Sequence, residues 1–295
     1  MKNMSVIQSL IETQEFATLP PVAARVLNLL EDDNIDVRDI SSVIETDASL
    51  TLKLLRVANS PLYATRTEIT SIHQAIMILG LNRLTNIVLG VSIFSKFLMS
   101  SQKGVSELME KFWLHTSSTG MVAKSLCRKI DKFYKENEFI GGLIHDIGKL
   151  AMIQYDAQKY LKVVDLIKNE NKTDHEAEKE IFDITHDEVG AEIARLWKLP
   201  SELSAIITYH SEPSKSENYK ELVAIVRLAD QLCEIWGADF YEGISALSIP
   251  ETESWQILTD SFPELKELDV EQFTFDLEEE FKNSGIFLNI LMQEA

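Results

Sequence analysis

Cysteine is nearly absent from this sequence of 295 residues, which contains only Cys127 and Cys233. Two cysteines cannot build a disulfide framework or a cysteine-rich zinc module, and both lie in apolar helical patterns, so we expect buried thiols in a reducing compartment. Glycine and proline are also scarce, at 11 and 7 residues, and no Asn-Gly or Asp-Gly pair occurs. These absences argue against a β-sandwich or barrel, whose hairpins depend on such turn residues.

Long hydrophobic stretches are lacking as well. The longest apolar run covers about residues 87–94, whereas a membrane-spanning helix needs about 20 apolar residues. The first turn contains one lysine and no unbroken apolar stretch, which is not the pattern of a secretory leader. We therefore expect a cytoplasmic protein with no membrane partner.

Positive charge is the third scarce feature, because 28 lysines and arginines stand against 47 acidic residues, for a net charge of −19. The imbalance lies after residue 104. Residues 1–104 carry 9 basic and 10 acidic residues, or −1, and residues 105–295 carry 19 and 37, or −18. An acidic surface repels a phosphate backbone, so we expect no nucleic-acid partner for the second part.

One segment of the near-neutral first part is similar to a DNA-binding helix-turn-helix. Residues 37–58 form two short predicted helices around Thr46-Asp47. The second helix offers only Lys53 and Arg56 to phosphate, while Leu50, Leu54 and Leu55 need burial. We therefore interpret this segment as scaffold.

Helical periodicity runs through almost every segment of the chain. Apolar residues recur three or four positions apart, and Asp36, Asp47 and Ser71 each precede such a pattern as candidate helix caps. The apolar segment 138–155 is expected to be helical with an interruption near Gly148. This periodicity, together with the lack of hairpin turns, predicts an all-α fold.

The expected organisation has three parts. A helical N-terminal subdomain covers residues 1–104, a helical bundle on which it packs covers residues 105–240, and an acidic helical extension covers residues 241–295. The small and polar residues 100–104 form the expected linker between the first two parts.

Six side chains with metal-binding chemistry are spread over the predicted bundle. His145 and Asp146 are adjacent in an apolar helical segment, so both can lean toward one ion between helices. Imidazole and carboxylate together suit iron, manganese, zinc or magnesium, and the second oxygen of Asp146 allows a second ion to be bridged. A bundle can bring the whole set to one point around one or two divalent ions. The candidate ligands are His115, His145, Asp146, His186, His210 and Asp230.

Each candidate also has an ordinary structural interpretation. His115 can be a hydrogen-bonded helix histidine, and Asp146 can pair with His145 and cap the turn at Gly148. Asp230 can pair with Arg227, three positions earlier on the same helix. The order of the whole set along the chain favours a metal site over these alternatives.

Two further histidines are expected to lie outside any site, and Lys149 has an ordinary interpretation as well. His73 stands beside a core helix, and His175 stands in the charged run at residues 172–179. Lys149 is interpreted as a solvated helix residue.

The candidate ligands resemble the H…HD…D motif of the HD superfamily of metal-dependent phosphohydrolases. The residues that match this motif, in order, are His115, His145-Asp146 and Asp230. His186 and His210 are similar to the additional metal ligands of the HD-GYP branch, and so is Lys149 in His-Asp-Ile-Gly-Lys.

The N-terminal part resembles the HD-related output domain (HDOD) family. The matching motifs are Leu19-Pro20-Pro21-Val22-Ala23, Ile44-Glu45-Thr46-Asp47-Ala48-Ser49-Leu50, Leu54-Leu55-Arg56-Val57-Ala58-Asn59-Ser60, Ile69-Thr70-Ser71-Ile72-His73-Gln74-Ala75-Ile76 and Leu79-Gly80-Leu81. The resemblance covers about residues 15–235. It implies an all-α bacterial protein of a signalling pathway, from a family mostly without demonstrated catalysis.

The sequence departs from the active HD-GYP branch after His210. That branch has H-H-E-x-x-D-G-x-G-Y-P, whereas this chain has Ser211 in place of the second histidine and no glycine between Gly190 and Gly237. The resemblance therefore implies a metal site without the loop that recognises a cyclic dinucleotide. Two hypotheses follow: a regulatory module that contacts signalling proteins or a second copy of itself, and a metal-dependent phosphohydrolase acting on a nucleotide or phosphoester.

Overall fold

The computed structural model describes residues 16, 18–30, 35–63, 65–98, 105–244, 246–282 and 288–289. These residues form helices and turns and contain no β-strand, so the all-α prediction is confirmed. No helix in this described part is both long and apolar enough to cross a bilayer.

The chain divides into two compact units, an N-terminal unit over residues 18–100 and a C-terminal unit over residues 101–284 that also includes Phe16. The expected linker at residues 100–104 lies outside the described residues. The three-part division of the sequence at residues 104 and 240 stays a prediction.

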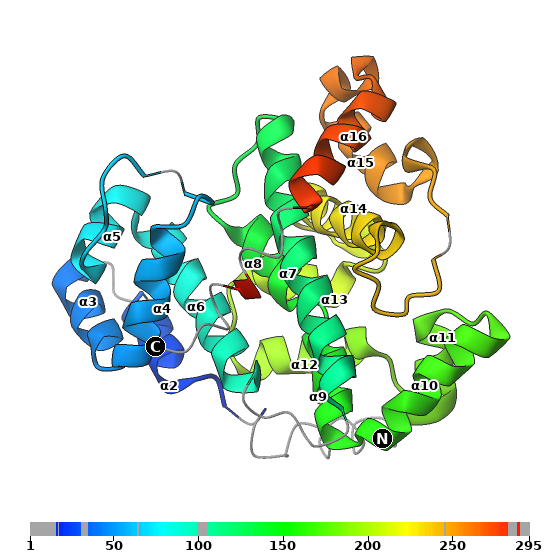
Figure 1. Cartoon of the computed structure of the whole chain (residues 1–295), viewed down its shortest axis with the longest axis horizontal. Coiled ribbons are helices and arrows are strands. Elements are labelled where there is room, and N and C mark those ends of the chain that lie inside the picture. The colour runs from blue at the N-terminus through cyan, green and yellow to red at the C-terminus, as the bar shows by residue number, and fades with distance from the viewer. Residues whose placement is uncertain are drawn as a thin grey trace. The chain divides into compact units, whose positions relative to one another are not determined.

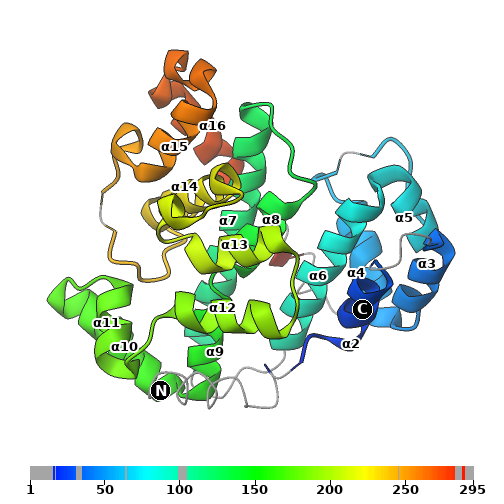
Figure 2. The same ribbon diagram turned by 180° about the vertical axis from the view of Figure 1, so that it is seen from behind.

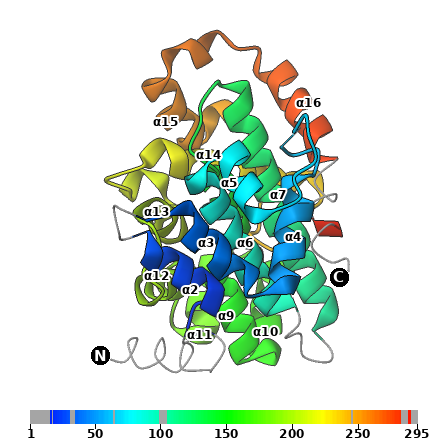
Figure 3. The same cartoon turned by 90° about the vertical axis from the view of Figure 1, so that its left-hand side faces the viewer.

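The N-terminal unit is a small bundle in which α6 packs against α2, α4 and α5 (Figure 3). Its helices are α2 (Pro21–Leu29), α3 (Val37–Glu45), α4 (Ala48–Ala58), α5 (Ile72–Leu79) and α6 (Leu81–Leu98).

The predicted caps of the N-terminal unit are confirmed. The Asp36 carboxylate accepts a hydrogen bond from the Arg38 amide at 2.8 Å, and Asp47 accepts one from the Leu50 amide at 2.9 Å. The Ser71 hydroxyl accepts from the Gln74 amide at 3.1 Å. These oxygens satisfy amides that the first helical turn leaves unpaired.

In the segment that is similar to a helix-turn-helix, two leucines of the second helix, α4, point into the core, while Leu55 is half-buried and Leu52 is exposed. Leu54 is fully buried and Leu50 nearly so, and the Lys53 ammonium donates to the Ser95 hydroxyl of α6 at 3.1 Å. These contacts fit the interpretation of α4 as scaffold.

Asn59 holds the loop that follows α4. Its side-chain oxygen accepts from the Ile69 amide at 2.8 Å, and its side-chain amide donates to the Ile69 carbonyl at 2.8 Å and to the Leu55 carbonyl at 2.9 Å. One side chain therefore ties both ends of the connection between α4 and α5.

The C-terminal unit is a larger helical bundle (Figures 1 and 2). Its α-helices are α7 (Ser106–Lys129), α8 (Asn137–Ile144), α9 (Ile147–Tyr155), α10 (Ala157–Glu170), α11 (Asp174–Phe182), α12 (His186–Leu196), α13 (Ser201–Tyr209), α14 (Lys220–Trp236), α15 (Glu253–Ser261) and α16 (Val270–Phe281). Short 3₁₀ helices are η1 (Pro213–Lys215), η2 (Ile249–Glu251) and η3 (Pro263–Glu267). Within it, α7, α8 and α14 pack on one another, α9 packs on α12, and α15 packs on α14.

We predict that Asn59→Ala loosens the loop between α4 and α5. Two hydrogen bonds to Ile69 are lost, at about 0.5–1.5 kcal/mol each. Hydrogen–deuterium exchange mass spectrometry should show faster exchange in peptides covering residues 60–70. The exposed Glu68→Ala serves as the matched control. Equal exchange in Asn59→Ala and wild type would contradict the role assigned to Asn59.

Candidate metal centre

The six predicted ligands meet inside the C-terminal unit. His115 lies within α7 and Asp230 within α14, while His145 and Asp146 form the break between α8 and α9. His186 is the first residue of α12, and His210 follows the last residue of α13. All six are buried, with exposures of 0–1%.

Glycines allow the helices that carry these residues to approach closely. The expected interruption near Gly148 is confirmed, and it lies at His145 and Asp146. Gly148 instead lets α9 cross α12, because a Cβ atom there would collide with the backbone oxygen of His186. A Cβ atom on Gly142 of α8 would lie 2.6 Å from the Cα of Gly120 on α7. Larger residues would push the histidine-bearing helices apart.

One half of the site lies between α7, α14 and the α8–α9 break. The His115 Nε2 atom lies 3.0 Å from Asp230 Oδ1 and 3.8 Å from Asp146 Oδ2. The His145 Nε2 atom lies 3.4 Å from Asp230 Oδ1 and 3.5 Å from Asp146 Oδ2. Two imidazole nitrogens and two carboxylate oxygens therefore surround one small space.

The other half lies between the same break, α12 and α13. The Nε2 atoms of His186 and His210 each lie 3.5 Å from Asp146 Oδ1. Asp146 thus turns one oxygen toward each half, and this is the arrangement of a bridging carboxylate.

The opposite nitrogen of each imidazole is already engaged. Carbonyl and carboxylate oxygens only accept hydrogen bonds, so each Nδ1 atom donates and the ring can present the lone pair of Nε2 to a metal. The acceptors are the Ala238 carbonyl for His115 at 2.8 Å, the Gly142 carbonyl for His145 at 2.7 Å, Glu178 for His186 at 2.8 Å and the Ile207 carbonyl for His210 at 3.3 Å.

The atoms that face the two halves lack partners in hydrogen-bond geometry. This holds for the Nε2 atoms of the four histidines, Oδ1 of Asp146 and Oδ1 of Asp230, while Asp146 Oδ2 lies 3.0 Å from the Lys149 ammonium. Buried polar atoms left in this state are costly unless a further group satisfies them. Ligands about 2.1 Å from one ion lie roughly 3.0–3.5 Å from each other, and most of the separations above fall in this range. The residues present therefore fit one or two divalent cations.

In the metal-free protein Asp146 and His115 have opposite charge states. Burial lowers the pKa of His115, but the carboxylates of Asp230, Glu234 and Asp146 outweigh burial and raise it to about 9. Burial raises the pKa of Asp146, but Lys149 and the surrounding imidazoles hold it well below the usual range. Asp146 is therefore ionised, and the proton on His115 is one that a bound cation would displace.

Lys149 is not the solvated residue that the sequence suggested. Its side chain is fully buried, with the ammonium 3.0 Å from Asp146 Oδ2 and 2.9 Å from Asp174 Oδ2. Burial lowers its pKa, but these two carboxylates raise it well above the usual value, so the charge is retained. The three-residue spacing from Asp146 on a helix was the only sequence signal for this ion pair.

The alternative interpretations have mixed outcomes. Arg227 does pair with Asp230, at 2.7 Å from Oδ2, and the same guanidinium contacts Glu242 at 2.7 Å. Asp230 Oδ1 still faces the histidines, so pairing and ligation are compatible. The Asp146 side chain makes no capping hydrogen bond to α9, and that interpretation is wrong.

Of the two histidines assigned outside the site, His73 is exposed on α5 and His175 lies beside His186. The His175 ring lies between two carboxylates, with Nδ1 2.9 Å from Asp174 and Nε2 2.6 Å from Asp187. His175 is therefore held beside the site, while its exclusion from the ligand set stays a prediction. The charged run around it gave no sign that the first turn of α11 brings this ring to the first turn of α12.

The fold and the site together define a class: an all-helical HD-like module whose histidine–aspartate pair meets further imidazoles and a second carboxylate. The HDOD domain family model matches residues 16–213, more than half of the chain, and the chain belongs to this family. This confirms the resemblance seen in the sequence.

Solved structures share the fold. An HDOD domain protein with unknown function from Geobacter sulfurreducens has a TM-score of 0.70 at 23% identity, covering 89% of this chain and 92% of that chain. A candidate phosphohydrolase from Shewanella amazonensis SB2B has a TM-score of 0.69 at 21% identity, and the match covers 96% of this chain and 98% of that chain. A candidate signal transduction protein from Marinobacter aquaeolei VT8 has a TM-score of 0.67 at 21% identity, and the match covers 93% of this chain and 59% of that chain.

Among curated proteins, an uncharacterized protein of Treponema pallidum (strain Nichols) is 25% identical over 214 residues. The match covers 72% of this chain and 41% of the relative, so this chain spans about two fifths of the length of that protein.

We predict that Lys149→Met destabilises the C-terminal unit in the presence of a chelator. The change leaves the Asp146 and Asp174 carboxylates buried without their cation, and loss of one partner of a buried ion pair costs about 3–5 kcal/mol. Urea denaturation followed by tryptophan fluorescence reports on this unit, because it contains all four tryptophans: Trp113, Trp197, Trp236 and Trp255.

The matched control is Lys162→Met on the exposed face of α10, which should change the free energy of unfolding by at most about 0.5 kcal/mol. A similar loss in both variants would show that Lys149 does not balance the charge of the site.

Proposed function

We propose that this protein is a regulatory module of signal transduction that acts through protein contacts and keeps its metal centre as a structural element without catalysis. The observation that supports this most directly is the burial of the centre. All six candidate ligands are at most 1% exposed, whereas a phosphoester has to reach the metal to be hydrolysed.

The cations beside the centre are already engaged. Lys149 is held between Asp146 and Asp174, and Arg227 between Asp230 and Glu242. A phosphate site needs donors that are free to bind its oxygens. The chain after His210 continues through Ser211 into the short helix η1 and supplies no glycine through which backbone could approach a phosphate closely.

The second candidate function is a metal-dependent phosphohydrolase. It is favoured by the paired halves of the site, with Asp146 facing both, because two adjacent ions can activate water and stabilise a phosphoryl group. The Shewanella relative is described as a candidate of this kind and the Marinobacter relative as a candidate signal transduction protein, so the relatives permit both functions.

Metal content and turnover separate the two functions. We predict that protein purified without chelator contains divalent metal, that Asp146→Ala contains less, and that neither hydrolyses cyclic dinucleotides, p-nitrophenyl phosphate or bis(p-nitrophenyl) phosphate after reconstitution with Mn²⁺. Elemental analysis and a colorimetric and chromatographic assay measure these outcomes. Wild-type turnover more than about tenfold above Asp146→Ala, a difference of about 1.4 kcal/mol in activation free energy, would establish the hydrolase instead.

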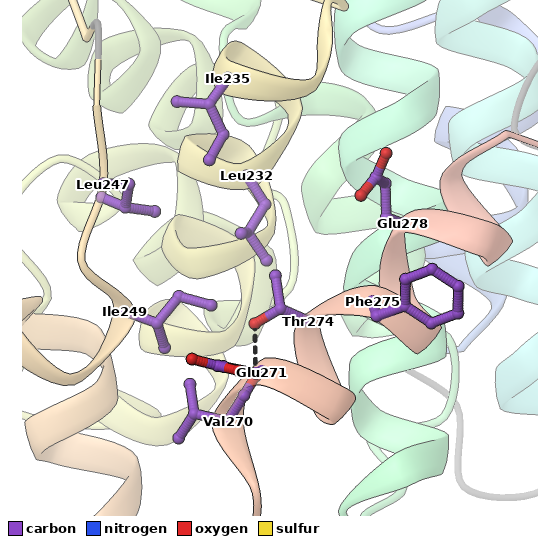
Figure 4. Close-up of a pocket in the computed structure, with 9 residues that line it drawn as sticks. All are labelled: Leu232, Ile235, Leu247, Ile249, Val270, Glu271, Thr274, Phe275 and Glu278. Atoms are coloured by element: carbon purple, nitrogen blue, oxygen red, sulfur yellow. Dashed lines mark hydrogen bonds between the residues drawn. The ribbon is translucent and has the colours of Figure 1, made fainter.

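An apolar pocket offers a surface for protein contacts. It has a volume of about 350 Å³ and lies between α14, the segment around Ile249 and α16 (Figure 4). Leu232 is fully buried at α14, and Phe275 on α16 is 57% exposed. The carboxylates Glu271 and Glu278 stand on α16 beside the apolar side chains. This combination fits a partner segment that inserts an apolar side chain flanked by lysine or arginine.

We predict that fluorescein-labelled helical peptides with leucine or phenylalanine flanked by lysines bind this pocket, with affinity that falls as salt rises. Phe275→Ser should weaken binding by about tenfold or more, as removal of an aromatic anchor does. Fluorescence anisotropy measures the change. Leu196→Ser on α12, also at an exposed apolar residue, is the matched control. Equal weakening in both variants, or stronger binding of glutamate-flanked peptides, would exclude the pocket.

A further inference from the structure

A carboxylate outside the predicted ligand set faces the second half of the centre. Asp187 directly follows His186 in α12. Its Oδ1 atom lies 3.3 Å from His186 Nε2 and 3.5 Å from His210 Nδ1. The Asp187 side chain is 18% exposed, whereas those of His186 and His210 are at most 1% exposed. Asp187 therefore occupies the solvent side of this half.

Two neighbours hold the Asp187 carboxylate in this position. The Ser211 hydroxyl donates to Oδ1 at 3.1 Å, and His175 Nε2 donates to Oδ2 at 2.6 Å. His175 is anchored in turn by Asp174, which accepts from its Nδ1 atom at 2.9 Å. Because both ring nitrogens face carboxylates, His175 donates on both sides. Hydrogen bonds of this kind, from neighbouring side chains to a ligand, are typical of metal sites in which the orientation of the ligand is fixed before an ion binds.

The separation between Asp187 Oδ1 and His186 Nε2 is that of two ligands on one ion, roughly 3.0–3.5 Å. Structural metal sites are closed by protein ligands, whereas catalytic sites keep one position open for water or substrate. The Asp187 carboxylate lies on the solvent side, where it can occupy the coordination position that water or substrate would otherwise take.

We propose that Asp187 is a further ligand of the second metal position, which closes that position to water and to anionic ligands. This inference rests on the proposed metal centre and explains in chemical terms why the centre does not turn over phosphoesters.

Co²⁺-loaded full-length protein provides the test, with azide as the probe of an open coordination position. We expect that azide leaves the visible d–d spectrum of wild type unchanged and perturbs the spectrum of Asp187→Ala. The second Co²⁺ should also dissociate about 10–100-fold more readily from this variant, as is usual for loss of a group that supports a metal site. Elemental analysis and competition with a chelator measure the retained metal.

Asp165→Ala, at an exposed aspartate of α10, is the matched control and should behave as wild type. Asp187→Asn keeps the shape of the side chain and weakens its charge, so it should give a smaller effect in the same direction even if Asp187→Ala folds poorly. An azide response in wild type equal to that of Asp187→Ala, or identical Co²⁺ retention in wild type, Asp187→Ala and Asp187→Asn, would overturn the role of Asp187 alone. Failure of wild type to bind any Co²⁺ would overturn the metal centre itself.

Discussion

The buried carboxylate of Asp146 is the group on which the C-terminal unit depends. It lies in the two-residue break between α8 and α9 and turns one oxygen toward His115 and His145 and the other toward His186 and His210. A buried charge of this kind is tolerated only where opposite charge surrounds it. Lys149 supplies one such charge within the same helix, and the remaining unsatisfied atoms point to a cation.

The backbone around Asp146 is built to allow this concentration of polar groups. The glycines of α7, α8 and α9 let helices cross with almost no side-chain layer between them, so imidazoles from distant parts of the chain reach one carboxylate. The carbonyls of Gly142 and Ala238 then orient His145 and His115. Close helix packing and ligand geometry are therefore one constraint, because a bulkier residue at a crossing would move a histidine as well as a helix.

The sequence predicted the all-α fold and the convergence of six polar residues, because helical periodicity and the order of the histidine and aspartate residues are local or motif-like signals. It did not predict the roles of Lys149, His175 or Asp187. Lys149 is a single charge in an apolar helical segment, whereas His175 and Asp187 stand in charged segments typical of a solvated surface. The burial of Lys149 and the partial burial of His175 and Asp187 follow from the packing of α9 on α12 and from the contact between His175 and Asp187, which is long-range information. The sequence placed the helix break near Gly148, but it did not show that Gly148 itself serves a helix crossing rather than the turn.

Charge connects the buried centre to the proposed function. The chain carries a net charge of −19, and the carboxylates of Asp146, Asp174, Asp187 and Asp230 are gathered around the site. This field attracts divalent cations and repels phosphoesters. A hydrolase would offset the repulsion with free lysine or arginine at an open metal position, but here Lys149 and Arg227 are bound by carboxylates and the centre is enclosed. In the function that we propose, the arrangement that would hold a metal stably is thus also the one that disfavours its use on an anionic substrate, and contacts with partners take place at the surface of the bundle.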